Sequence, residues 1–138
     1  MNTGNTGTVV FDANFEFSDK TIGQKILVVL NDGTEGIFVV LKTTSQSKHK
    51  GINNGCQTTD RYPNFFVAQG QCFLHKDTWI MLDQFFEFDR SDFMAKGLRT
   101  IGQLPPAIIK DLLDCAMNCD DITTAQENLL RQVRASLP

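Results

Sequence analysis

The fold of this chain is decided by two runs, Lys25-Ile26-Leu27-Val28-Val29-Leu30 and Ile37-Phe38-Val39-Val40-Leu41-Lys42-Thr43-Thr44. Both are rich in β-branched and aliphatic residues, which favour strands. The connection from Asn31 to Gly36 contains Asp32-Gly33. An Asp-Gly pair between such runs predicts a hairpin, because glycine accepts the positive φ of a tight turn.

Shorter strand signals lie on both sides of this hairpin. Val9-Val10-Phe11 is apolar, and Phe15 and Phe17 alternate with Glu16 at the period of a half-buried strand. The near-continuous apolarity of 78–88 predicts a strand buried on both faces. Further strands are expected at 65–67 and 72–74, after a polar loop over 45–60. Many short strands in so short a stretch favour a small closed antiparallel barrel, because closure removes exposed edges.

After Phe88 the pattern changes to helical spacing. Ser91 is a candidate N-cap for a short helix through Leu98, which Gly102 would end. Pro105-Pro106 predicts the start of a longer helix. Thr123 with Gln126, or Thr124 with Glu127, forms a capping box for a last helix. The chain of 138 residues therefore predicts one α+β domain, 1–138, with a flexible leader over 1–8, a β-barrel over 9–88 and a helical tail over 89–138.

The sequence also predicts the compartment. No run approaches the roughly 20 apolar residues that span a bilayer, and Met1 to Thr8 lacks the basic and apolar regions of a secretory signal. We therefore expect a cytoplasmic protein that does not contact a membrane. On that basis the four cysteines, Cys56, Cys72, Cys115 and Cys119, are expected to be free thiols without metal, although Cys115 and Cys119 are spaced so that a helix could offer both as ligands.

The net charge of −3 conceals an uneven distribution. From Asp83 to Glu127 there are nine acids and four bases, whereas the span from Lys42 to Lys76 has one acid, Asp60. A polyanion could bind this basic middle. The alternative is that the loop over 45–55 is only a solvated connection. The five cations of the span are Lys42, Lys48, Lys50, Arg61 and Lys76.

Standard catalytic signatures are missing: the chain has no P-loop, no dinucleotide-binding glycine triplet, no nucleophile elbow and no His-Glu-x-x-His. Its two histidines, His49 and His75, are expected in a polar loop and at a strand entrance, respectively. No cofactor is predicted.

A resemblance to the PemK/MazF toxin family enters with the paired strands. In 25–30 a cationic residue opens an apolar strand, and in 39–45 a strand ends in Thr44-Ser45, as in that family. The run 78–83 is similar to a later strand of the family beside the same cleft. The similarity spans 8–88, and the tail over 104–137 is longer than the family's usual end.

This resemblance implies an SH3-like barrel that forms a homodimer, cleaves RNA as an endoribonuclease and is neutralised by an antitoxin. Lys25 stands where the family has its catalytic arginine, and Thr44 or Ser45 where it has the hydroxyl partner. Here the usual Arg-Pro is Lys25-Ile26. This change matters because only arginine offers a rigid bidentate fork to a phosphate.

The implied chemistry is attack of a ribose 2′-hydroxyl on the adjacent phosphate. Lys25 would stabilise the developing charge, Thr44 or Ser45 would bond a phosphate oxygen, and His49 would exchange the proton. Alternatively, Thr44 and Ser45 only end a strand and Lys25 is a solvated strand start. The competing hypothesis for function is a non-enzymatic module of a mobile element or phage that binds a host protein. Convergence of Lys25, Thr44 and His49 in one open cleft would favour the nuclease.

Overall fold

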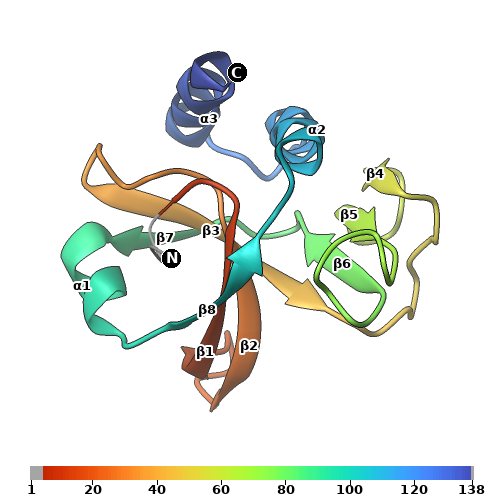
Figure 1. Cartoon of the computed structure of the whole chain (residues 1–138), viewed down its shortest axis with the longest axis horizontal. Helices are drawn as coiled ribbons and strands as arrows, with labels where there is room; N and C mark the ends of the chain where they lie inside the picture. Colours follow the sequence, from red (N-terminus) through yellow and green to blue (C-terminus); the bar gives the residue numbers. More distant parts are fainter. Residues whose placement is uncertain (1–4, 138) are drawn as a thin grey trace.

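An antiparallel sheet of eight strands and three helices form the protein in its computed structural model, which describes residues 5–137. The α+β class is therefore confirmed. The strand order is β4-β5-β6-β3-β2-β1-β8, with β7 also paired to β3. The sheet is barrel-like in its curvature, but β4 and β8 end the strand order without pairing to each other (Figure 1). The elements are β1 Thr8–Glu16, β2 Ile22–Val29, β3 Ile37–Thr44, β4 Gly55–Gln57, β5 Asn64–Val67, β6 Thr78–Met81, β7 Phe86–Asp89, α1 Arg90–Ala95, β8 Arg99–Gln103, α2 Pro106–Met117 and α3 Thr124–Ser136.

The central strands are buried on both faces, which explains their continuous apolar sequences. On β2, Val28 belongs to a cluster that includes residues of α2 and α3, whereas Leu27 and Val29 belong to a second cluster with Phe93 of α1. Figure 1 shows α2 and α3 side by side, away from α1, which lies next to β7. The second cluster and the side chains packed on it hold much of the aromatic content: Phe15, Phe17, Phe38, Phe86, Phe88 and Phe93.

The predicted hairpin between β2 and β3 is confirmed, with Val28 opposite Leu41. Its connection is held by the Asn31 side chain, whose amide nitrogen donates to the Ile37 carbonyl at 2.9 Å and whose oxygen accepts from the Val39 amide at 2.8 Å. Gly33 has a φ of 75° and packs so closely on the Phe38 ring that a Cβ there would lie 2.5 Å from a ring carbon. Glycine is therefore required at this turn.

Several expected boundaries were wrong. The 78–88 run is two strands, β6 and β7, and β7 is only partly buried because one of its faces is exposed. Residues 72–74 are not a strand, and β4 forms at the expected Asn54-Gly55 turn. The helix α1 begins after the N-cap Asp89 instead of Ser91, and Gly97, with a φ of 70°, follows its end instead of Gly102. The chain then returns to the sheet as β8, inside the expected helical tail.

The two ends of the described chain are firmly attached. Residues 1–4 of the expected leader lie outside the described residues, but Gly7 donates to the Val29 carbonyl at 2.7 Å and Thr8 is buried as the first residue of β1. Both predicted C-terminal helices are confirmed. Helix α2 has Pro106 at its first position, and α3 has the Thr123–Gln126 capping box.

Cys56 and Cys115 form a disulfide that joins β4 to α2, so the expectation of four free thiols was wrong for this pair. Sequence spacing could not reveal it, because the two residues are 59 positions apart and only the fold brings their Cα atoms to 5.5 Å, within the range that a disulfide requires. Cys72 and Cys119 are free. The expectation of reduced thiols, which was drawn from a predicted cytoplasmic location, is therefore wrong for Cys56 and Cys115.

Cys115 therefore cannot serve as the metal ligand considered above. Within residues 5–137, no cluster of three or more His, Cys, Asp and Glu side chains is placed to hold a metal ion. A helix of the length and apolarity needed to cross a bilayer is also missing from this part of the chain.

Candidate functional site

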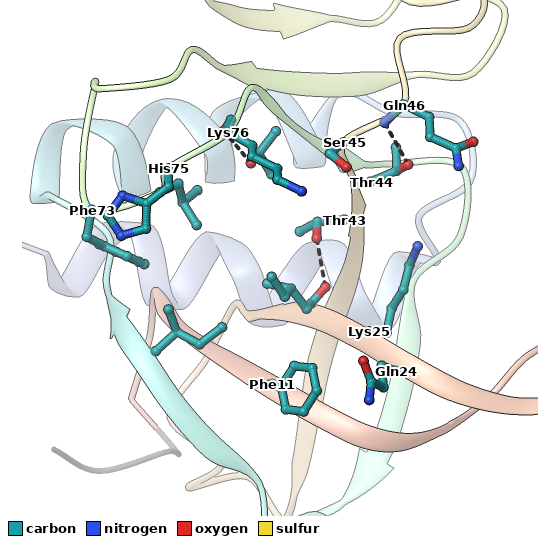
Figure 2. A pocket seen from close by; sticks show the side chains of 14 residues that line it. Phe11, Gln24, Lys25, Thr43, Thr44, Ser45, Gln46, Phe73, His75 and Lys76 are labelled. Carbon is teal, nitrogen blue, oxygen red and sulfur yellow. Dashed lines mark hydrogen bonds between the residues drawn. The ribbon is translucent and has the colours of Figure 1, made fainter.

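A cavity of about 630 Å³ opens where the first half of β2 meets the end of β3. Its side chains come from β1, β2, β3, β8 and the segment before β6, so it gathers residues that are far apart in sequence. Figure 2 shows Lys25 and Gln24 on one side and Phe73 and His75 across from them. The lining is apolar at Phe11, Ile26, Phe73, Leu74 and Ile101 and polar at Gln24, Lys25, Thr43, Thr44, Ser45, Gln46, His75, Lys76 and Thr78.

Lys25 is the cation at the centre of the site. It is half-buried on β2, and no acidic side chain among residues 5–137 forms an ion pair with it. Its neighbour across the β1–β2 ladder, Asp12, is instead paired with Lys96 at 3.1 Å. Burial lowers the pKa of the Lys25 ammonium, and the charges of Lys42 and Lys50 lower it further. The site therefore holds a cation that an anion would stabilise.

The hydroxyl groups at the end of β3 have different surroundings. Thr43 is buried and donates to the Ile26 carbonyl at 2.9 Å, which uses its proton to hold β2 against β3. The Thr44 oxygen accepts from the Gln46 amide at 3.2 Å, so its own proton remains available for a ligand. Ser45 is exposed at the rim of the cavity. Thr44 and Ser45 can thus both donate to a phosphate oxygen.

His75 and Lys76 reach the same cavity from the exposed segment before β6. Lys76 belongs to the basic span that a polyanion was expected to bind, whereas His75 was expected at a strand entrance and was not among the predicted site residues. The missed signal was its position directly before Lys76. His75 therefore brings to this side of the cavity an imidazole, a type of side chain that can act as a general acid or base.

A second cavity of about 260 Å³ shares Lys25, Thr43 and Thr44 with the first. Lys42 and Lys50 also line it, and Asp83 is the acidic side chain among its described lining residues. The Asp83 Oδ1 atom is buried and has no hydrogen-bond partner among residues 5–137. A buried acceptor without a donor is costly, and a hydroxyl or amino group of a ligand would satisfy it. Asp83 and the neighbouring Tyr62 were not among the predicted site residues.

The loop that carries Lys50 is fixed by hydrogen bonds. The next residue, Gly51, donates its amide to Asp60 at 2.9 Å, and its carbonyl accepts from the Trp79 indole at 2.8 Å and from the Gln57 side chain at 3.0 Å. The Lys50 ammonium itself donates to the backbone carbonyls of Gln46 and Lys48, at 3.1 Å and 3.0 Å. These hydrogen bonds therefore fix the loop and hold Lys50 at the second cavity.

The remaining predicted residues lie outside both cavities. His49 is exposed at a φ of 61°, with its Nε2 atom 3.4 Å from Arg61, and Arg61 lies over the Tyr62 ring at 5.4 Å. Lys48 is also exposed on this loop. Lys25 and Thr44 thus converge in an open cleft as the nuclease hypothesis requires, but His49 does not join them and His75 does.

We call the two adjoining cavities the cleft. It combines lysines at positions 25, 42, 50 and 76, two available hydroxyls, an imidazole and the Asp83 carboxylate, whose buried Oδ1 atom has no hydrogen-bond partner among residues 5–137. Comparisons of the chain with models of known protein families and with curated proteins find no match.

Proposed function

We propose that the cleft binds the backbone of single-stranded RNA and cleaves it, so that the protein acts as a PemK/MazF-like toxin-type endoribonuclease. The observation that carries the proposal is the convergence, in one cleft, of lysines that form no ion pair within residues 5–137 with hydroxyls that can still donate, in a chain whose net charge is −3. Phosphate is the ligand that such a cluster recognises, and lysines that contact phosphates give binding without base information. The ribose 2′-hydroxyl is the only nucleophile that the reaction needs.

The proposed chemistry assigns a role to each group that lines the cleft. The 2′-oxygen bonds to the adjacent phosphorus, its proton passes to His75 or Asp83, the bond from phosphorus to the 5′-oxygen breaks, and that oxygen receives a proton. Lys25 stabilises the charge on the phosphorane, and its lowered pKa also makes it a better proton donor to the leaving oxygen. Thr44 and Ser45 hold the phosphate oxygens. The products are a 2′,3′-cyclic phosphate and a 5′-hydroxyl.

Binding can be tested with a fluorescent single-stranded RNA whose affinity is measured by anisotropy across a salt series. The logarithm of the affinity should fall linearly with the logarithm of salt concentration, with a slope of about −0.7 per neutralised phosphate. Replacing Lys48 and Lys50 together by alanine should weaken binding by a similar factor for every sequence and make the slope shallower. Lys110→Ala, on α2 outside the cleft, is the matched control and should change neither.

The acid–base roles are separated by histidine and aspartate variants. His75→Asn or Asp83→Asn should slow cleavage by about a hundredfold while RNA binding persists, because general acid–base groups typically contribute that much or more. His49→Asn should cleave like the parent. If the parent protein binds no RNA at low salt, the nuclease proposal is wrong and the protein-binding module becomes the better account.

A further inference from the structure

Phe11 occupies an unusual position for a large aromatic residue. It is half-buried on β1 and lines the larger cavity, but it is not among the side chains that pack on the three hydrophobic clusters of residues 5–137. By contrast Phe17, which is equally half-buried, packs on the second cluster and touches Phe15 with ring centroids 5.3 Å apart. Phe11 therefore contributes little to these clusters and lines the cavity instead.

An arginine lies over the same ring. The guanidinium carbon of Arg99, at the start of β8, is 5.0 Å from the centroid of the Phe11 ring, directly across the β1–β8 ladder. Arg99 is exposed, and no carboxylate within residues 5–137 forms an ion pair with it. It lies outside the basic span from Lys42 to Lys76, so the fold adds beside Phe11 a cation that the charge pattern did not indicate.

The surroundings fit a flat aromatic ligand attached to a phosphate. Ile26, Phe73 and Ile101 continue the apolar lining, and Lys25 stands on the same side of the cavity as Phe11 (Figure 2). The volume of about 630 Å³ lies within the range of about 300–1,000 Å³ that small-ligand sites occupy. Single-stranded RNA is read through unstacked bases that lie on aromatic and arginine planes.

We propose that Phe11 and Arg99 form a stacking platform for one unpaired nucleobase of the bound RNA, placed so that the phosphate beside it reaches Lys25. This inference rests on the proposed function. It adds that Phe11 and Arg99 bind a nucleobase of the substrate. The aromatic ring supplies the stacking face, and the guanidinium attracts both the π-face of the base and the phosphate charge. One nucleotide should therefore contribute far more to affinity than its neighbours.

The test uses a 2′-O-methyl oligonucleotide, which cannot be cleaved, and a set of copies in which each nucleotide in turn is abasic. For the parent protein, one abasic position should cost about tenfold in affinity, the loss expected for one stacked base, and the others much less. Phe11→Leu should bind the intact strand about tenfold more weakly and should no longer respond to that abasic position. Arg99→Gln should show the same pattern with a smaller loss of affinity. Because this variant keeps the aromatic ring, it tests the platform even if Phe11→Leu proves unstable.

Phe17→Leu is the matched control, since it removes an equally half-buried aromatic ring outside both cavities. It should leave the abasic profile unchanged. A flat abasic profile, or a Phe11→Leu variant that folds and binds like the parent, overturns the platform while leaving RNA binding intact. A parent protein that binds no RNA overturns the platform and the proposed function together.

Discussion

The strands β2 and β3 each contain two contrasting halves. In the packed half, Leu27 to Val29 and Phe38 to Leu41 are almost completely buried, and every side chain contacts one of the two large clusters. In the cleft half, Lys25, Lys42 and Thr44 are half-buried and polar. The packed half pairs β3 with β7, whereas the end of β3 pairs with β6. The same two strands thus serve the core at one end and the candidate site at the other.

Residues of the packed half stabilise the fold, whereas the polar residues of the cleft half do not. The Lys25 ammonium is partly desolvated beside two other lysines and gains no ion pair within residues 5–137, so it contributes little to the stability of the fold. Perturbed groups of this kind gather at functional sites. We therefore expect changes in the packed half to alter stability and changes in the cleft half to alter function.

The largest effect on stability should come from the disulfide that fastens β4, an end strand on the cleft side, to α2. Because it closes a loop between residues 59 apart, its removal by Cys56→Ser with Cys115→Ser should cost about 4 kcal/mol of unfolding free energy. Urea unfolding monitored by tryptophan fluorescence measures this, since Trp79 lies beside this region. Cys72→Ser, at an unpaired cysteine, should cost much less. Coincident curves for the double variant and the parent would rule out a stabilising bond.

The next prediction compares two residues on one strand. Leu27→Ala in the packed half should lower the unfolding free energy by about 2–5 kcal/mol, because it leaves a cavity in a fully buried cluster. Lys25→Ala, two positions away, should change it by less than about 0.5 kcal/mol. Equal losses for the two variants would show that Lys25 has a structural role and would remove the contrast between the halves.

The lysine cluster predicts a titration effect. Since the pKa of Lys25 in the fold lies below its ordinary value of 10.5, the unfolded chain binds more protons in that window, and stability should rise with pH as it is crossed. Lys42→Gln removes one of the repelling charges and should move the pKa of Lys25 upward, although burial will keep it lowered. NMR titration of the Lys25 Cε resonance measures the shift. Lys20→Gln, at an exposed lysine outside the cleft, should leave it unchanged, and an unmoved value in Lys42→Gln would contradict the cluster.

The smallest effect concerns the free cysteines. Burial, with the charges of Asp121 and Asp120, raises the pKa of the Cys119 thiol to about 11. The neutral thiol therefore stabilises the fold below pH 9.0, and that contribution is lost as the pH rises toward about 11. At pH 8 iodoacetamide should modify Cys119 far more slowly than in the urea-unfolded chain, as read by peptide mass spectrometry. Equal rates in the two states would place this thiol in solvent.

Much of the fold could be predicted because local signals agreed with it. The Asp32-Gly33 turn, Pro106 and the Thr123 capping box each reflect a local backbone preference, and each appears as expected. The strand β8 was missed because it is held by pairing with the distant β1. The strand β4 was missed because it has only three residues, which pair with β5 inside a region expected to be a polar loop. The Gly97 turn and the hydrogen bonds to β1 draw 99–103 into the sheet, where its sequence shows no strong strand pattern. The disulfide was hidden for the same reason.

Part of the site could be predicted, from the family resemblance and from the basic span. The family resemblance implied Lys25, Thr44 and Ser45, and the basic span contains Lys42, Lys50 and Lys76; all six line the cleft. His75 and Asp83 reach it through the packing of the segments before and after β6, which sequence spacing does not specify. Arg99 lies over the Phe11 ring because β8 pairs with β1, and that pairing was not predicted either. His49 was chosen because it is near Thr44 in sequence, but the positive φ at the loop and its contact with Arg61 place it outside the cavities.

The most direct test of the central claim is the rate at which the purified protein cuts a labelled single-stranded RNA at low salt, with the new termini identified by mass spectrometry. The account predicts 2′,3′-cyclic phosphate and 5′-hydroxyl ends for the parent and for Lys110→Ala, and no cleavage by Lys25→Ala, which should retain the parent's unfolding free energy within about 0.5 kcal/mol. Cleavage by Lys25→Ala at the parent rate, or no cleavage by the parent, would contradict it.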